Sequence, residues 1–146
     1  MIDDQPGGPI RWRMHLPAPP ERVFRALDTG EGRAAFWAES AEESGDGIHF
    51  HFIDGSRHVS RVVERDAPRR WVIEYFCGVA AFELAPDGAG GTDLLLMHTG
   101  VPGDEWHDVH AGWLNVLFPL KAWLAHGVDL RNHDPARTWE QGYADQ

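Results

Sequence analysis

Two histidines lie on either side of the turn between a predicted strand and a predicted long helix, and imidazoles are the side chains best suited to acid–base chemistry near neutral pH. His98 is predicted to close the strand at residues 92–98. His110 follows in the helix, between Trp106 and Trp113. If both imidazoles face one cavity, they can transfer protons or orient a polar group of a ligand. The alternative is structural: each ring hydrogen-bonds to nearby backbone or water, because a catalytic histidine needs a matched partner and the spacing shows none.

A carboxylate and a thiol lie in and just after the strand predicted at residues 70–76. If the face of the strand that carries Glu74 is buried, the pKa of this carboxyl is raised and the group can act as a base or bind a hydroxyl. The opposite face carries Trp71 and Tyr75 among its large apolar residues, which favours a solvated Glu74. Cys77 has no neighbouring histidine to activate it, so we interpret its thiol as inert.

Histidines elsewhere have only part of the spacing that a metal site needs. His49 and His51 share one face of a predicted strand and His58 follows the next turn, but no cysteine or carboxylate completes a recognised motif. His107 and His110 lack the i, i+4 spacing of the metalloprotease helix. Ser-His-Asp arrangements, phosphate-binding glycine loops and paired catalytic carboxylates are absent as well. We therefore predict no metal, no cofactor and no catalytic residue, and we favour a binding protein over an enzyme.

Composition restricts the class of protein and of partner. The chain has 146 residues and a single cysteine, which excludes an internal disulfide and favours the reducing cytoplasm. Its formal net charge is -10, from 13 basic and 23 acidic residues, and this balance argues against nucleic-acid binding. No run of about eighteen apolar residues and no apolar N-terminal segment occur, so we expect neither a membrane span nor a secretory signal. All basic residues except Lys121 are arginines, a bias typical of a GC-rich bacterial genome.

Hydrophobic periodicity predicts one α+β domain over residues 9–127. Alternating patterns separated by turn residues indicate about six antiparallel strands, at residues 10–16, 47–52, 58–65, 70–76, 79–84 and 92–98. Two short helices are expected after the first strand, near residues 20–27 and 31–37. A longer helix follows at residues 106–126, with its large side chains spaced by three and four residues. Pro119 lies inside that pattern, so we expect a kink there or two helices end to end.

A polar tail, residues 128–146, follows Gly127, which suits a left-handed helix cap. Leu130, Trp139 and Tyr143 make this segment too apolar for a free extension. We therefore expect the tail to dock on its own domain or on a second subunit of a symmetric dimer, with Trp139 at the contact centre in the dimer.

The order of these elements resembles the helix-grip fold of the START-like (SRPBCC) superfamily. Within it, the chain is similar to the family of the activator of heat-shock protein 90 ATPase homologue, over residues 10–126. The motifs that carry the resemblance are PPERVFRAL at residues 19–27, FW at 36–37, PRRWVI at 68–73, FEL at 82–84, GTDLLLMHTG at 91–100 and GW at 112–113. The resemblance implies a curved sheet wrapped around a long C-terminal helix, often with a cavity between them. Members act as co-chaperones, ligand carriers or cyclases, so the fold does not imply one activity.

A helix laid across a curved sheet leaves gaps, and the usual ligand site is a concave apolar pocket with few polar groups. We therefore expect a small hydrophobic or aromatic molecule to bind between sheet and helix, lined by Trp37 and Trp113 and anchored by His98 and His110. The expected cavity residues are Trp37, Phe50, Glu74, Phe82, His98, Trp106, His110, Trp113 and Leu117. Two alternatives stay open: a protein-interaction domain that regulates a chaperone ATPase, and an enzyme of the cyclase or hydrolase type that uses His98 or His110.

Overall fold

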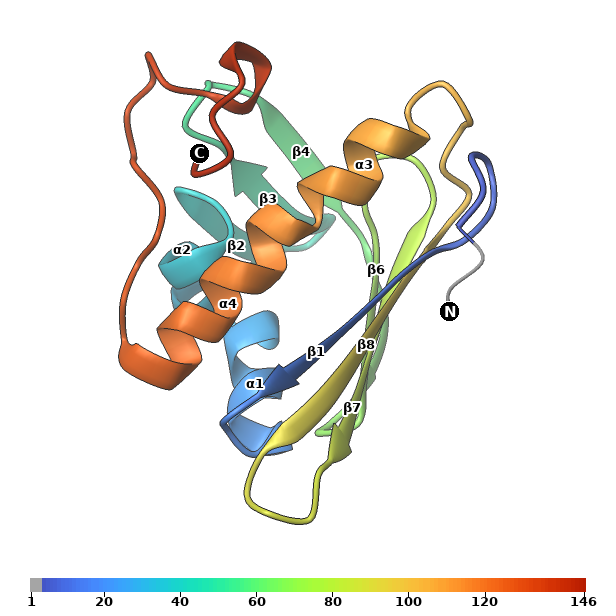
Figure 1. Ribbon diagram of the computed structural model, residues 1–146, viewed down its shortest axis with the longest axis vertical. Coiled ribbons are helices and arrows are strands. Elements are labelled where there is room, and N and C mark those ends of the chain that lie inside the picture. Colours follow the sequence, from blue (N-terminus) through green and yellow to red (C-terminus); the bar gives the residue numbers. More distant parts are fainter. Residues whose placement is uncertain (1–3) are drawn as a thin grey trace.

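The computed structural model describes residues 4–146 and has the predicted α+β architecture (Figure 1). The strands are β1 Ile10–Leu16, β2 Ser40–Ser44, β3 Gly47–His51, β4 Arg57–Ser60, β5 Val62–Asp66, β6 Arg70–Glu74, β7 Val79–Pro86 and β8 Thr92–Thr99. The helices are α1 Pro20–Asp28 and α2 Gly30–Phe36 after β1, and α3 Trp106–Gly112 and α4 Leu114–His126 after β8. A short 3-10 helix, Trp139–Gln141, lies in the tail.

The strands form two antiparallel sheets rather than one sheet of about six strands. The larger sheet has the order β1-β8-β7-β6-β5, and the smaller one has the order β2-β3-β4. Periodicity does not predict β2, because its sequence SAEES is polar and largely exposed. The strand expected at residues 58–65 is divided at Arg61, where the chain leaves the small sheet as β4 and enters the large sheet as β5.

Helices α3 and α4 run end to end across the larger sheet as one broken rod (Figure 1). They meet at Trp113 and not at Pro119, which lies inside α4 without ending it. The expectation of two helices end to end is therefore confirmed, but the break is not at the proline. Gly112 is a poor helix former, and its position matches the break. The N–H of Trp113 donates to the carbonyl of Val109 in α3 across 3.1 Å, and the carbonyl of Trp113 accepts from the N–H of Leu117 in α4 across 2.9 Å, so the two helices stay connected. Within residues 4–146, none of the helices has the length and hydropathy needed to cross a bilayer.

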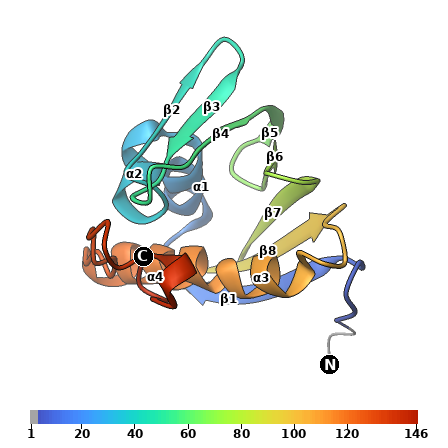
Figure 2. The ribbon, with the colours of Figure 1, turned by 90° about the horizontal axis from the view of Figure 1, so that it is seen from above.

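Aromatic side chains fill most of the space between the sheets and α4. Figure 2 shows α1 and α2 between the small sheet and α4, and Trp37 follows α2 directly. The rings of Phe50, Trp71, Phe82 and Trp113 surround Trp37 at centroid distances of 5.0 to 6.2 Å. Phe50, Trp71 and Phe82 are fully buried. The centre of the domain is therefore packed, and the space for a ligand lies toward one end.

The tail doubles back from the end of α4 toward α3 (Figure 1). Arg131 is only 8% exposed, and its guanidinium donates to the carbonyl oxygens of Ala34 (2.7 Å) and Ala38 (2.8 Å) around the end of α2. The indole N–H of Trp139 donates to Oδ1 of Asp108 on α3 across 2.8 Å. These hydrogen bonds hold the tail against its own domain.

Candidate functional site

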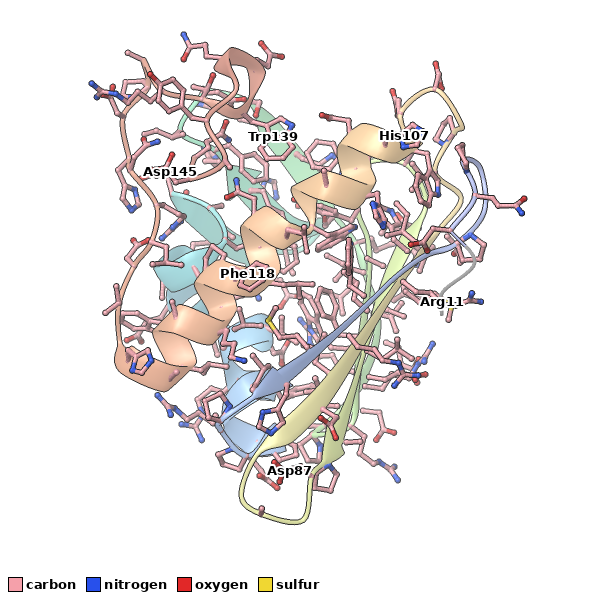
Figure 3. All side chains as sticks on the ribbon, viewed as in Figure 1. Arg11, Asp87, His107, Phe118, Trp139 and Asp145 are labelled. Atoms are coloured by element: carbon pink, nitrogen blue, oxygen red, sulfur yellow. The ribbon has the colours of Figure 1, made fainter. Side chains whose placement is uncertain are left out.

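An open cleft of about 550 Å³ lies beside the α3–α4 junction. Its walls come from the end of α2, the β3–β4 and β6–β7 turns, the end of β8, both helices and the tail. Its apolar lining is Trp37, Phe52, Tyr75, Phe76, Val109, Trp113, Val116 and Trp139, and its acidic lining is Asp54, Asp104, Glu105, Asp108 and Glu140. Figure 3 shows Trp139 between the tail and the rod formed by α3 and α4. Segments far apart in the sequence thus contribute rings to one hollow.

His98 lies on the floor of the cleft with both ring nitrogens engaged. The indole N–H of Trp113 donates to Nδ1 of His98 across 3.0 Å, and Nε2 lies 2.9 Å from the carbonyl oxygen of Cys77. Because an indole can only donate, Nδ1 carries no hydrogen and Nε2–H donates to Cys77. The side chain is fully buried, and this burial lowers its pKa. The ring is therefore a neutral structural element, which is the alternative interpretation of His98.

His110 does not meet His98, so the expected pair of histidines is not assembled. Its ring is stacked between Trp12, at 4.5 Å between centroids, and Trp106, at 4.6 Å. Its Nε2 is 3.4 Å from Oδ2 of Asp4, but the geometry does not make a hydrogen bond. The turn of α3 points His110 toward β1, and the next turn points Trp113 toward β8. The histidine is part of an aromatic stack at the other side of the helix.

Only part of the expected lining reaches the cleft. The residues that do are Trp37, His98 and Trp113. Phe50, Phe82 and Leu117 have no exposed surface and belong to the packed core below it. The indole N–H of Trp106 donates to the carbonyl oxygen of Gly8 across 2.8 Å, on the side away from the cleft.

Glu74 also lies outside the cleft, as the solvated alternative predicts. Trp71 and Ile73 on the other face of β6 are fully buried, so that face belongs to the core. The carboxylate of Glu74 is half-exposed and lies 2.7 Å from the guanidinium of Arg61. The hydrogen bond from Arg61 holds the pKa of Glu74 below its ordinary value. Glu74 therefore belongs to a surface ion pair and does not have the raised pKa that is expected of a buried carboxyl.

Tyr75 places a polar group on the floor of the cleft. The side chain is nine-tenths buried, and its oxygen accepts a hydrogen bond from the indole N–H of Trp37 across 3.0 Å. Burial raises the pKa of the phenol, which therefore stays protonated. Its own hydrogen has no acceptor among residues 4–146. The alternating pattern of residues 70–76 predicts that Tyr75 faces the core, but it does not predict that the core opens there.

Phe76 presents an exposed ring at the mouth of the cleft. Its φ of 52° lies in the left-handed region, which is costly for a bulky side chain, and its surface is 52% exposed. Its ring stacks on His58 at 4.2 Å, and its backbone N–H donates to Nε2 of His58 across 2.9 Å. Burial lowers the pKa of His58, so the supporting imidazole is neutral. The alternating pattern extends the strand to Phe76, whereas β6 ends at Glu74.

Carboxylates dominate the charge of the cleft. The ion pairs formed within residues 4–146 include none of its five acidic residues, and no lysine or arginine lines it. The thiol of Cys77 donates to Oε2 of Glu105 across 3.0 Å, and this bond raises the pKa of the thiol. Across the part of the chain that the structure describes, no three His, Cys, Asp or Glu side chains converge as a metal site would require.

Solved structures of other proteins share this fold. Protein SSP2350 from Staphylococcus saprophyticus has a TM-score of 0.73 at 20% identity, covering 84% of this chain and 96% of its own. The Aha1 dimer from Colwellia psychrerythraea has a TM-score of 0.73 at 20% identity, covering 82% and 97%. Protein CV1439 from Chromobacterium violaceum has a TM-score of 0.63 at 25% identity, covering 80% and 96%. No match was found among curated proteins.

Most of the domain matches one known protein family. Residues 17–125 match the sequence pattern of the family "Activator of Hsp90 ATPase homolog 1-like protein". This range includes the short helices, the strands from β2 to β8 and nearly all of α4. The likeness to START-like helix-grip proteins is confirmed as well. The chain therefore belongs to the family of activator of Hsp90 ATPase homolog 1-like proteins.

Proposed function

We propose that the protein binds a small aromatic or apolar molecule in the cleft beside the α3–α4 junction. The observation that carries the proposal is the ring arrangement: Trp37, Tyr75 and Trp113 form a buried floor, and Phe76 and Trp139 stand at the mouth. Small-molecule sites are usually concave, mainly apolar hollows of roughly 300–1,000 Å³ with few polar groups. The cleft, at about 550 Å³, fits that description.

The polar groups of the floor support binding rather than catalysis. His98 has no free ring nitrogen with which to accept a proton. The Cys77 thiol is held protonated by its bond to Glu105, and a protonated thiol is a poor nucleophile. The hydroxyl of Tyr75 is left as an anchor, and its hydrogen suits an oxygen acceptor on the ligand.

A single glycine allows the proposal to be tested by filling the cleft. Gly112 lines the cleft, and a Cβ at this position would have no heavy atom of residues 4–146 within 4 Å apart from its chain neighbours and the backbone of its own helix. Gly112→Leu should therefore occupy the hollow without disturbing the packing, whereas Gly112→Ala shares the gain in helix propensity but adds little volume.

Naphthol and phenylpropanol are suitable probes, followed by tryptophan fluorescence. The wild type and Gly112→Ala should bind, and Gly112→Leu should bind about tenfold more weakly or worse, with no loss in Tm. Full binding by Gly112→Leu, or no binding by any of the three chains, contradicts the proposal.

Regulation of a chaperone ATPase is a second candidate, favoured by the family description. Such a role uses an exposed surface, and the net charge of -10 would make the interaction weaken as salt is added. Capture of an Hsp90 homologue by the purified chain, in a salt series, tests it. Gly112→Leu should retain this capture if the chaperone surface is separate from the cleft.

Self-association is a further part of the proposal. A groove of about 370 Å³ between α4 and the tail is lined by Phe118 and Leu130, which are 53% and 48% exposed. The similar Aha1 protein from Colwellia psychrerythraea is described as a dimer. We infer that a second copy of this chain covers the groove. Light scattering should give the mass of two chains for the wild type and of one for Phe118→Glu; a monomeric wild type excludes the dimer.

A further inference from the structure

We propose that the ligand of the cleft is an organic cation, an amine attached to an aromatic or apolar body. This inference rests on the proposed binding function and adds the charge of the ligand. It is carried by the combination of aromatic rings, uncompensated carboxylates and one buried hydroxyl in the same hollow.

The rim of the cleft has formal negative charge, and no lysine or arginine among residues 4–146 lines it. Asp104 and Glu140 are exposed and form neither a hydrogen bond nor an ion pair within residues 4–146. In the part of the chain that the structure describes, Asp54 and Asp108 accept hydrogen bonds only from neutral groups, and Glu105 accepts one from a thiol. A hollow lined by charges of one sign concentrates ligands of the opposite sign.

The histidines nearest to the cleft do not offset this charge. His98 accepts at Nδ1 from Trp113, and His58 accepts at Nε2 from the backbone of Phe76. An imidazole that accepts a hydrogen bond is unprotonated at that nitrogen, so both rings are neutral. A carboxylate ligand would therefore find no positive partner among the described residues of the floor and the rim.

Aromatic faces provide the second element of cation recognition. Phe76 and Trp139 stand at the mouth beside the carboxylates, and Trp113 lies on the floor. Rings attract a cation through their negative faces, most strongly where water is excluded. Carboxylates at the rim and rings behind them would hold an ammonium group and the apolar body that carries it.

The spread of the acidic side chains favours an organic cation over a metal ion. No group of three ligands among residues 4–146 converges on a point. An extended ligand can reach several separate carboxylates, which a bare ion cannot do.

The position of Tyr75 indicates which end of the ligand lies on the floor of the cleft. Its hydroxyl hydrogen lacks an acceptor within residues 4–146, and the side chain is nine-tenths buried on the floor. A hydroxyl or carbonyl oxygen at the inner end of the ligand can accept this hydrogen. The positive group would then lie outward, toward Asp104 and Glu140 at the rim.

Three probes of one shape separate charge from shape: phenylpropylamine, phenylpropanol and phenylpropanoate, titrated at neutral pH and low salt by tryptophan fluorescence. The amine should bind about tenfold or more tightly than the alcohol, and the acid should bind most weakly. Added salt should weaken the binding of the amine and leave the affinity for the alcohol unchanged. Equal affinity for amine and alcohol, or tighter binding of the acid, overturns the cation inference but leaves the binding function standing. No binding by any probe overturns both.

Two variants locate the effect. The double variant Asp104→Asn with Glu140→Gln should weaken amine binding about threefold or more and leave alcohol binding unchanged. Asp93→Asn is the control for the loss of a carboxylate away from the cleft, since Asp93 lies on β8 about 17 Å from His98 along the strand. It removes a charge from the same protein but not from the cleft, so it should not change either affinity. An equal effect of the double variant and the control contradicts the inference.

Discussion

The indole N–H of Trp113 donates a hydrogen bond to Nδ1 of His98 across 3.0 Å and joins the α3–α4 junction to the end of β8. Because the indole is only a donor, the bond selects the neutral tautomer of His98 with its hydrogen on Nε2. The carbonyl oxygen of Cys77 accepts that hydrogen across 2.9 Å. Helix, strand and turn are thereby held in one arrangement beneath the cleft.

Trp113→Phe should destabilise the protein by about 1–3 kcal/mol, because the ring packing is largely kept while Nδ1 of His98 loses its donor in a buried place. Urea unfolding measures this loss. Trp123→Phe is the matched control, since Trp123 packs against the core and forms no side-chain hydrogen bond within residues 4–146. Equal losses for the two variants would show that the hydrogen bond contributes nothing.

The stability that His98 contributes should depend on pH. Burial lowers its pKa in the folded protein below the ordinary value of 6.5. The folded chain then binds fewer protons at this site than the unfolded chain, so the contribution is fully present above about pH 6.5 and is lost as pH falls toward the folded pKa. Burial also lowers the pKa of His58, so its contribution to stability is likewise lost as pH falls. The pKa of His133 is raised by its bond to Asp129, so its contribution is present at low pH and is lost as pH rises through the folded pKa.

Comparison of the wild type with His98→Gln isolates the contribution of His98 to stability, because His58 and His133 are common to both chains. The difference in free energy of unfolding should narrow as pH is lowered from about 7.5 to about 5. Urea unfolding at a series of pH values gives this difference. A gap that stays constant over the range would mean that the pKa of His98 is the same in the folded and unfolded chains.

The tail offers a matched pair of arginines. Arg131→Met removes a buried guanidinium from the carbonyl oxygens of Ala34 and Ala38, and should cost about 2–4 kcal/mol and expose the tail to proteases. Arg137→Met removes an exposed ion pair with Asp134 and should cost about 0.5 kcal/mol or less. Chemical unfolding and limited proteolysis of both variants test the contrast. Similar small effects would mean that the tail adds little to the fold.

Tyr75→Phe should affect both stability and ligand choice. Trp37 loses the acceptor for its indole N–H, at a cost of about 1–3 kcal/mol in a buried place. Affinity for phenylpropanol should fall relative to that for propylbenzene, which has no oxygen to accept the phenol hydrogen. Tyr143→Phe, at a side chain that is 41% exposed, is the control. Parallel losses for both ligands would show that the Tyr75 hydroxyl does not contact the ligand.

Local patterns in the sequence are sufficient for most of the secondary structure. The alternation around residues 92–98 predicts β8 and places His98 on the same face as Leu94 and Leu96, because side chains of a strand alternate between its faces. The structure shows that this face is the buried one. The same rule predicts that Trp71 and Ile73 are buried and that Glu74 is solvated. The motifs around these strands also indicate the family, and the family match covers the residues that carry most of them.

Local patterns fail where several segments compete for one place. Pro119 is the stronger helix breaker in the sequence, yet the rod breaks at Trp113. The rotation of that turn depends on packing, and it gives His98 a partner in Trp113 rather than in His110. Periodicity describes one element at a time and does not contain the angle between two elements.

The chain by itself determines the domain class, which residues share a face of each main strand, and a strong excess of acidic residues. Only the tertiary structure decides that Tyr75, Phe76 and Trp139 meet at one hollow, bordered by carboxylates that form no ion pair within residues 4–146. These residues come from a turn and a tail, whose positions depend on contacts made across the whole fold. A local sequence pattern does not contain the distances between segments that are far apart in the chain. The cleft can therefore be seen only in the folded structure.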